Sequence, residues 1–123
     1  MVKSYEDLKV WQKAMELARE VYRCAKLMPK DERFGLTNQM CRAAVSVPSN
    51  VAEGFGREST KDFLHFLMMA RGSLHELRTQ LTLSVQLEFL PNADDAFSLI
   101  ADVSRLLNAL ITKLKSKLTT TNH

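Results

Sequence analysis

Apolar residues recur along this chain in four runs, and within each run they are separated by steps of three and four residues. That spacing places them on one face of an α-helix, whereas a strand would alternate apolar and polar residues. The four runs are Leu8, Trp11, Met15, Ala18, Tyr22 and Ala25; Leu36, Met40, Ala44, Val47, Val51 and Phe55; Phe63, Leu67, Ala70, Leu74, Leu77 and Leu81; and Ile100, Val103, Leu107, Leu110 and Leu114. The pattern therefore predicts four amphipathic helices and no strand.

Capping residues and helix breakers separate the four runs. At three starts a Ser or Asn precedes an Asp by three residues, so that its side chain can accept a hydrogen bond from a free amide at the helix start. These pairs are Ser4 with Asp7, Ser59 with Asp62, and Asn92 with Asp95. Pro or Gly interrupts residues 28–31, 54–57 and 90–92. Short connections predict an all-α, up-down-up-down antiparallel four-helix bundle over residues 1–118, with a disordered C-terminal tail over residues 119–123.

The first predicted helix has an apolar surface wider than a bundle requires. A second stripe beside the first widens the apolar arc to about 160°, against the roughly 100° that a core-facing helix needs. This stripe consists of Val10, Ala14, Leu17, Val21, Cys24 and Met28. In the third helix region, Leu83, Leu87 and Leu90 also lie off the main stripe. Either the first helix is deeply inserted in the bundle, or part of this arc contacts another subunit; we expect the latter.

The segment RAAVSVPSNVAEGFGR, residues 42–57, places Pro48 inside a helical pattern. Proline has no amide hydrogen, so the carbonyl of Ala44 loses its usual partner and the helix should bend. Donors close enough in sequence to replace that partner are Ser46, Ser49 and Asn50. Small residues in the segment favour close approach of a neighbouring helix, for which we expect the patch Ala70, Gly72 and Ser73. Pro48 is thus interpreted as an architectural bend.

Polar residues in the same segment also follow helical spacing. Steps of three and four residues connect Arg42, Ser46, Ser49, Glu53 and Arg57. Alternating charges on one helix are typical of a solvated face or a structural network. The functional interpretation is that the two arginines contribute to a basic surface while Glu53 orients them.

Composition is that of an ordinary globular domain. Of the 123 residues, 46% are hydrophobic and 25% are charged, which is enough apolar material for a folded core without disulfides. The two cysteines, Cys24 and Cys41, lack metal-binding spacing and are expected to be small buried hydrophobic residues. No signal peptide and no run of eighteen apolar residues is present, which favours a cytoplasmic protein without a membrane partner.

The net charge of +3 favours anionic partners weakly, since a small basic excess also serves solubility. Candidates for contact with the phosphates of RNA or DNA are Arg42, Arg57, Lys61, Arg71, Arg78, Lys113, Lys115 and Lys117. Two of them, Arg71 and Arg78, are one heptad apart and can share a helix face. The three C-terminal lysines can instead complement the negative end of the last helix.

Catalytic and metal-binding patterns are not found. His65 and His75 are ten residues apart, which is not the spacing of a zinc-binding helix. Asp62 and His65 have the spacing of half a di-iron site, but the second half and the further inward glutamates are missing. Gly54 and Gly56 are not followed by the residues of a phosphate-binding loop. We therefore predict no enzyme activity, no cofactor and no metal.

Four segments together resemble a known family. YEDLKVWQKAMELA, FGLTNQM, RAAVSVPSNVAEGFGRES and FLHFLMMARGSLHEL, within residues 5 to about 90, resemble the 23S ribosomal RNA intervening sequence proteins. The resemblance implies a homopentameric ring of four-helix bundles. It also implies kinship with the accessory protein of diversity-generating retroelements, a basic pentameric barrel that binds nucleic acid and a reverse transcriptase. Signature positions carried over are Asn50, Ala52, Glu53, Gly54 and Arg57, with Pro48 beside them, in an architectural role.

The sequence thus predicts a non-enzymatic oligomeric bundle that binds RNA or DNA through phosphate contacts, as an adaptor for a protein partner. Five copies of a chain of net charge +3 carry +15, which would strengthen binding through counterion release and multivalency. The alternative is a protein-interaction scaffold with no nucleic-acid binding.

Overall fold

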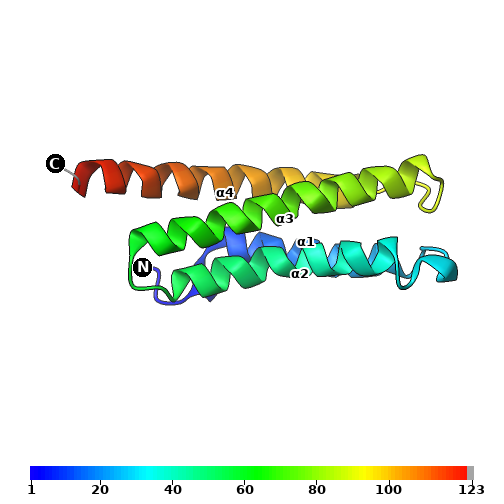
Figure 1. Ribbon diagram of the computed structural model, residues 1–123, viewed down its shortest axis with the longest axis horizontal. Helices are drawn as coiled ribbons and strands as arrows, with labels where there is room; N and C mark the ends of the chain where they lie inside the picture. Colours follow the sequence, from blue (N-terminus) through cyan, green and yellow to red (C-terminus); the bar gives the residue numbers. More distant parts are fainter. Residues whose placement is uncertain (122–123) are drawn as a thin grey trace.

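A computed structural model describes residues 1–121 and shows a bundle of four long helices (Figure 1). The elements are the 3-10 helices η1 (Tyr5–Asp7) and η2 (Lys30–Glu32) and the α-helices α1 (Lys9–Ala25), α2 (Leu36–Phe55), α3 (Thr60–Gln86) and α4 (Asp94–Thr121). Successive helices run antiparallel, and α1 contacts α4 as well as α2, so the four helices form a closed square. The predicted all-α, up-down-up-down fold is confirmed.

The helix starts follow the predicted capping chemistry with one difference. Ser59 accepts a hydrogen bond from the amide of Asp62 at 3.1 Å, and Asn92 accepts one from the amide of Asp94 at 3.3 Å. Ser4 and Asp7 form the reciprocal capping box, but it closes η1 rather than α1. The backbone then becomes extended at Leu8, and α1 begins at Lys9. The cap was therefore predicted correctly and assigned to the wrong helix.

The core contains the stripe of α1 that was expected at a subunit interface. Val10, Leu17 and Cys24 are all buried inside the single chain, whereas Tyr22, from the stripe expected in the core, is 51% exposed. The reason is that α1 is covered by both α2 and α4, and the side of α1 that carries Leu17 faces the inside of the bundle. The inserted-helix alternative is therefore the correct one for this stripe.

The other leucines expected off the α3 stripe divide in the same way. Leu90 is buried in the core, while Leu83 and Leu87 are exposed. Between them the chain turns at Glu88, whose φ of 62° is left-handed, and the amide of Phe89 donates to the carbonyl of Ser84 at 2.9 Å. This bond closes the end of α3 with the geometry of a Schellman motif.

The C-terminal helix is longer than the sequence predicted. Residues 119–121, which were assigned to a disordered tail, continue α4, and the Thr119 hydroxyl donates to the carbonyl of Lys115 at 3.1 Å. Residues 122 and 123 of that predicted tail lie outside the described residues. Within the described chain, no helix combines the length and the apolar character needed to cross a membrane.

Candidate nucleic-acid interface

Two predicted phosphate-binding arginines lie on the side of α3 that faces α4. The Arg71 guanidinium donates to Asn108 Oδ1 at 3.0 Å and contacts Met68 Sδ at 3.2 Å. One heptad further along α3, the Arg78 guanidinium lies 5.8 Å from the centre of the Phe97 ring. Residues of α4 therefore orient both guanidinium groups, and Arg78 stays exposed to solvent.

The three α4 lysines point in two directions. Lys115 is seven residues from Asn108, about two helical turns, so it lies on the same side of α4 as the partner of Arg71. Lys113 and Lys117 are one turn apart, and each lies about 160° around the helix from Lys115. The sequence grouped these residues by proximity along the chain, but the helix separates them in space.

Arg57 and Lys61 lie at the turn between α2 and α3. The Arg57 guanidinium forms an exposed ion pair with Glu53 at 3.1 Å and covers the Phe66 ring at 4.7 Å. Glu53 therefore orients Arg57, in keeping with the functional interpretation of the polar residues of α2. Figure 1 shows that this turn and the C-terminal end of α4 lie at the same end of the bundle. Beyond Asp102, the chain has Arg105 and three lysines but no Asp or Glu.

Arg42 is separated from the other basic candidates, because it lies on the edge of α2 that borders a groove with α3. In the same groove Ser46 Oγ and Ser73 Oγ are 2.9 Å apart. The Asn50 amide donates to the carbonyl and to the hydroxyl oxygen of Ser46, at 2.9 and 3.0 Å. The signature residue Asn50 thus fixes a polar contact between two helices.

The groups expected to compensate for Pro48 bind carbonyls one and two positions beyond the predicted one. The Ser49 hydroxyl donates to the carbonyl of Val45 at 2.8 Å, and Asn50 donates to that of Ser46, rather than to that of Ala44. Each side chain reaches back four residues along its own helix, which is the distance that helix geometry allows. Helix α2 continues on both sides of Pro48, which is buried.

Close approach at Gly54 is confirmed, but its neighbour differs from the expected one. A Cβ atom on Gly54 would lie 2.7 Å from Phe66 Cβ and 3.0 Å from Phe63 Cδ1. Of the small patch expected there, Ser73 instead meets Ser46, and a Cβ on Gly72 would have no heavy atom within 4 Å. The antiparallel register explains this, since the end of α2 must meet the start of α3.

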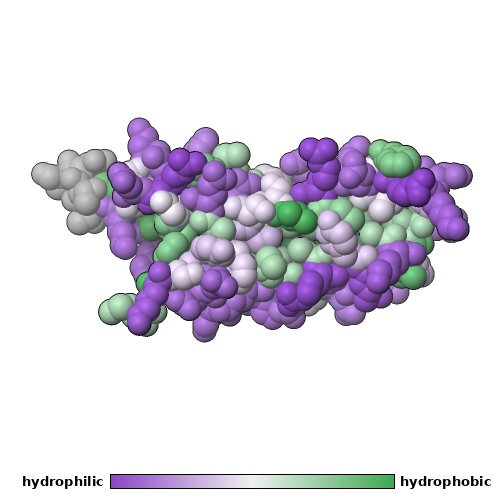
Figure 2. Space-filling model, turned by 90° about the horizontal axis from the view of Figure 1, so that it is seen from below, coloured by the Kyte–Doolittle hydropathy of each residue, from purple (hydrophilic) through white to green (hydrophobic). Residues whose placement is uncertain are grey.

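An apolar surface runs along the outside of α1 and α2, and most of its residues were expected in the core. We define the α1–α2 apolar band as Trp11, Met15, Tyr22, Cys41 and Val45. Val45 is 43% exposed, and Trp11, Met15 and Cys41 are partly exposed. Figure 2 shows pale and green, less hydrophilic atoms along the middle of the face seen from below, with hydrophilic residues on both edges. The signal was present in the sequence as two adjacent apolar stripes on α1, but the stripe expected in the core is the one that lies outside.

The remaining candidates have the properties of structural residues. Burial, together with the neighbouring Glu20 carboxylate, raises the pKa of the Cys24 thiol to about 11, so little thiolate exists at neutral pH. Burial also raises the pKa of Cys41. His65 and His75 are exposed, and no group of three or more potential ligand side chains in residues 1–121 is arranged to hold a metal ion.

Comparisons with known proteins address the family and the fold. None of the curated protein sequences matches this chain. A crystal structure of a protein with unknown function from the S23 ribosomal protein family of Bacteroides thetaiotaomicron is similar in fold, with a TM-score of 0.77 and 22% identity over 84% of this chain and 95% of that chain. The family model of the 23S rRNA-intervening sequence protein matches residues 6–111. The chain therefore belongs to the 23S rRNA-intervening sequence protein family, and its residues 5 to about 90 were recognised correctly as such.

Proposed function

We propose that this protein is a non-enzymatic, self-assembling cytoplasmic bundle that binds the phosphate backbone of RNA or DNA. The observation that supports this most is the arrangement of Arg71 and Arg78, which residues of α4 hold in place one heptad apart. A guanidinium that is oriented before binding loses less conformational freedom when it contacts a phosphate. Lys115, on the same side of α4 as Asn108, extends this basic surface.

The spacing of the two arginines suits a nucleic-acid strand. Seven residues of α-helix correspond to about 10.5 Å along the axis, and phosphates of one B-form strand follow each other at about 3.4 Å along the duplex. Arg71 and Arg78 can therefore contact phosphates about three nucleotides apart. Contacts of this kind do not read the sequence, so the proposal predicts binding to many sequences with strong dependence on salt.

Self-assembly is the second half of the proposal, and the α1–α2 apolar band supports it. Soluble monomers rarely expose a continuous apolar stripe, and this one has hydrophilic borders like those of a subunit interface (Figure 2). The band lies on a different side of the bundle from Arg71 and Arg78, since α1 and α2 form one side and α3 and α4 the other (Figure 1). Assembly into the pentamer expected from the family resemblance would leave the arginines accessible.

The proposal is tested by fluorescence anisotropy with a labelled single-stranded oligonucleotide at several salt concentrations. Each phosphate contact contributes about 0.7 to the slope of log affinity against log salt for a single strand. The double variant Arg71→Ala with Arg78→Ala should therefore lower the slope by about 1.4. Arg19→Ala, an exposed arginine on α1, removes a similar charge elsewhere and should leave the slope nearly unchanged. Absence of binding at low salt would overturn the proposal.

The second candidate function is a scaffold that binds other proteins only, such as the reverse transcriptase implied by the resemblance. The exposed ring of Phe34, which is 83% accessible in the α1–α2 connection, favours this alternative, because large apolar side chains at such positions are common protein contacts. An assembled protein that fails to bind any oligonucleotide at low salt would support the scaffold.

A further inference from the structure

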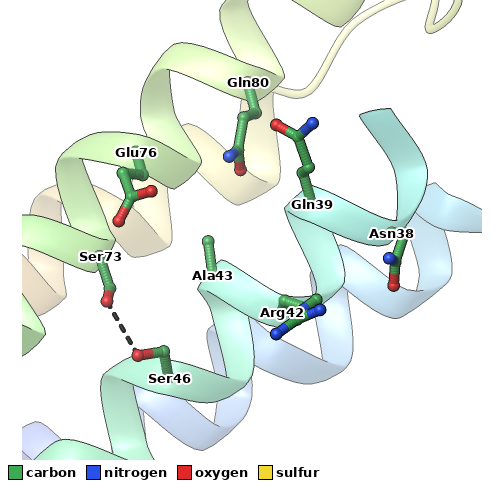
Figure 3. Close-up of a pocket in the computed structure, with 8 residues that line it drawn as sticks. All are labelled: Asn38, Gln39, Arg42, Ala43, Ser46, Ser73, Glu76 and Gln80. Carbon is green, nitrogen blue, oxygen red and sulfur yellow. Dashed lines mark hydrogen bonds between the residues drawn. The ribbon is translucent and has the colours of Figure 1, made fainter. Parts of the chain in front are cut away.

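A polar groove between α2 and α3 is not explained by phosphate binding alone. Its volume is about 450 Å³, and it is lined by Asn38, Gln39, Arg42, Ala43, Ser46, Ser73, Glu76 and Gln80. Figure 3 shows the α3 side chains Glu76 and Gln80 opposite the α2 residues Gln39 and Ala43, with open space between them. The groove is large enough for one nucleotide unit.

Most polar groups of the groove have no partner within the protein. Gln80 Oε1 is buried, and no donor reaches it. Among residues 1–121, no hydrogen bond or ion pair engages the side chains of Gln39, Arg42 or Glu76. A buried acceptor without a donor is costly, and structures that retain one commonly satisfy it with a bound group. The groove therefore presents polar side chains that can form hydrogen bonds with a polar ligand.

The closed end of the groove is held rigidly. Ser46 Oγ and Ser73 Oγ bridge the two helices at 2.9 Å, and Asn50 donates to both oxygen atoms of Ser46. This network fixes the relative position of the two walls. Donors lie on the α2 wall, in Arg42 and the amide of Gln39, whereas the acceptors Glu76 and Gln80 Oε1 lie on the α3 wall.

We propose that the groove binds the guanine base of a single-stranded nucleic acid, with the Glu76 carboxylate accepting hydrogen bonds from the base. This inference rests on the proposed nucleic-acid binding and adds a base preference to it. Guanine is the one common base with two adjacent N–H donors, N1 and N2, on its Watson–Crick edge, and a carboxylate has two acceptors at a matching separation. Adenine, cytosine and uracil each place an acceptor beside their donor, which a carboxylate repels.

The other groove residues complete the recognition. Arg42 at the rim is exposed and available to the adjoining phosphate, as expected for a guanidinium. A Watson–Crick edge is free only in unpaired nucleotides, so the site selects single strands, as is usual where proteins read RNA by its bases. Arg42 thereby acquires a role separate from that of Arg71 and Arg78.

The test compares oligonucleotides of about 12 thymidines, within the range of single-strand site sizes, that differ at one central position. This position is guanine in one probe, hypoxanthine in the second, which lacks the N2 amino group, and thymine in the third. The guanine probe should bind about tenfold more tightly than the thymine probe, the size expected for a bidentate base contact, and the hypoxanthine probe should lose most of that gain.

Glu76→Gln should abolish the preference for guanine while leaving affinity for the thymine probe within about twofold, since it alters no phosphate contact. Glu16→Gln, on α1, removes an equal charge outside the groove and should keep the preference. Circular dichroism confirms that each variant is folded. Equal affinity for the guanine and thymine probes, or a Glu76→Gln variant that still prefers guanine, overturns the inference.

The two proposals fail differently. Binding of all three probes with equal, salt-dependent affinity supports phosphate binding and overturns guanine recognition. If no probe binds at low salt, the phosphate-binding proposal is overturned. In that case, titration with guanosine monophosphate followed by NMR tests guanine binding in the groove independently. Chemical-shift changes at Glu76 and Gln80 that Glu76→Gln removes would support the site, and their absence would overturn it.

Discussion

At Gly54, near the end of the bundle, α2 and α3 approach each other closely. Because a Cβ would lie 2.7 Å from Phe66 Cβ and 3.2 Å from the carbonyl oxygen of Phe63, Gly54→Ala should force the helices apart. We expect a loss of about 1–3 kcal/mol in the free energy of unfolding, measured by urea denaturation.

Gly72→Ala is the matched control, since its Cβ would meet no heavy atom within 4 Å and the residue lies inside α3. Alanine is a better helix former, so this variant should gain up to about 1 kcal/mol. If both substitutions change the free energy of unfolding in the same direction, the close contact at Gly54 does not determine the effect of adding a Cβ there.

Glu88 stores backbone strain at the end of α3. Its φ of 62° is in the left-handed region, which costs a residue with a side chain about 1–2 kcal/mol and costs glycine little. Glu88→Gly should therefore raise the melting temperature by several degrees for a chain of this size. Glu88→Gln keeps the strain and removes the charge, so thermal unfolding of this control should remain close to that of the unaltered protein.

Glu20 should make stability depend on acid pH. The hydrogen bond from Arg23, at 2.6 Å, lowers the pKa of this carboxyl below its ordinary value of 4.5. A lowered folded-state pKa means that the stabilisation is present above pH 4.5 and is lost as pH falls through the folded value. Unfolding in urea should show that Glu20→Gln is less stable than the unaltered protein at pH 7, with the difference shrinking at pH 3. A difference that stays constant with pH would contradict the role of the ion pair.

At the scale of helices, the spacing of apolar residues and the residues that begin or end helices were sufficient to predict the fold. Proline, glycine and capping residues mark the connections, and steps of three and four residues identify each apolar stripe. Rotation of a helix about its axis was not predictable where two stripes compete, as on α1. One cue was available, because Tyr22 and Trp11 carry polar atoms that favour partial exposure, whereas Leu17 carries none.

The candidate site was predictable only where it depends on spacing within one helix. The spacing of Arg71 and Arg78 was enough to place both on one face of α3. Contacts with Asn108 and Phe97, and the groove that joins Arg42 to Glu76, depend on the register between helices that are separate in sequence. The register between two helices cannot be read from the spacing of residues within either helix.

The corrected orientation of α1 changes which substitution tests assembly. Val45→Glu places a charge in the α1–α2 apolar band, at a residue 43% exposed in the chain, and should reduce the mass measured by light scattering while helicity remains. Leu83→Glu, on α3 and also 43% exposed, is the control and should leave the mass unchanged.

Leu17→Glu, in contrast, buries an unpaired charge inside the single chain, and should unfold the protein rather than separate subunits. A protein that is monomeric at micromolar concentration, or a Val45→Glu variant with unaltered mass, would show that the band is not the contact between copies.

For the whole molecule, contact between the first and last helices has a consequence for synthesis. Each of the other helix pairs joins elements that are consecutive in the chain, whereas the side of α1 next to α4 is covered only by residues after Asp94. During translation, α1, α2 and α3 can therefore begin to associate early, with part of their shared apolar surface still open to water. The nascent protein is therefore most exposed to aggregation and to chaperones until α4, which covers that surface, has left the ribosome.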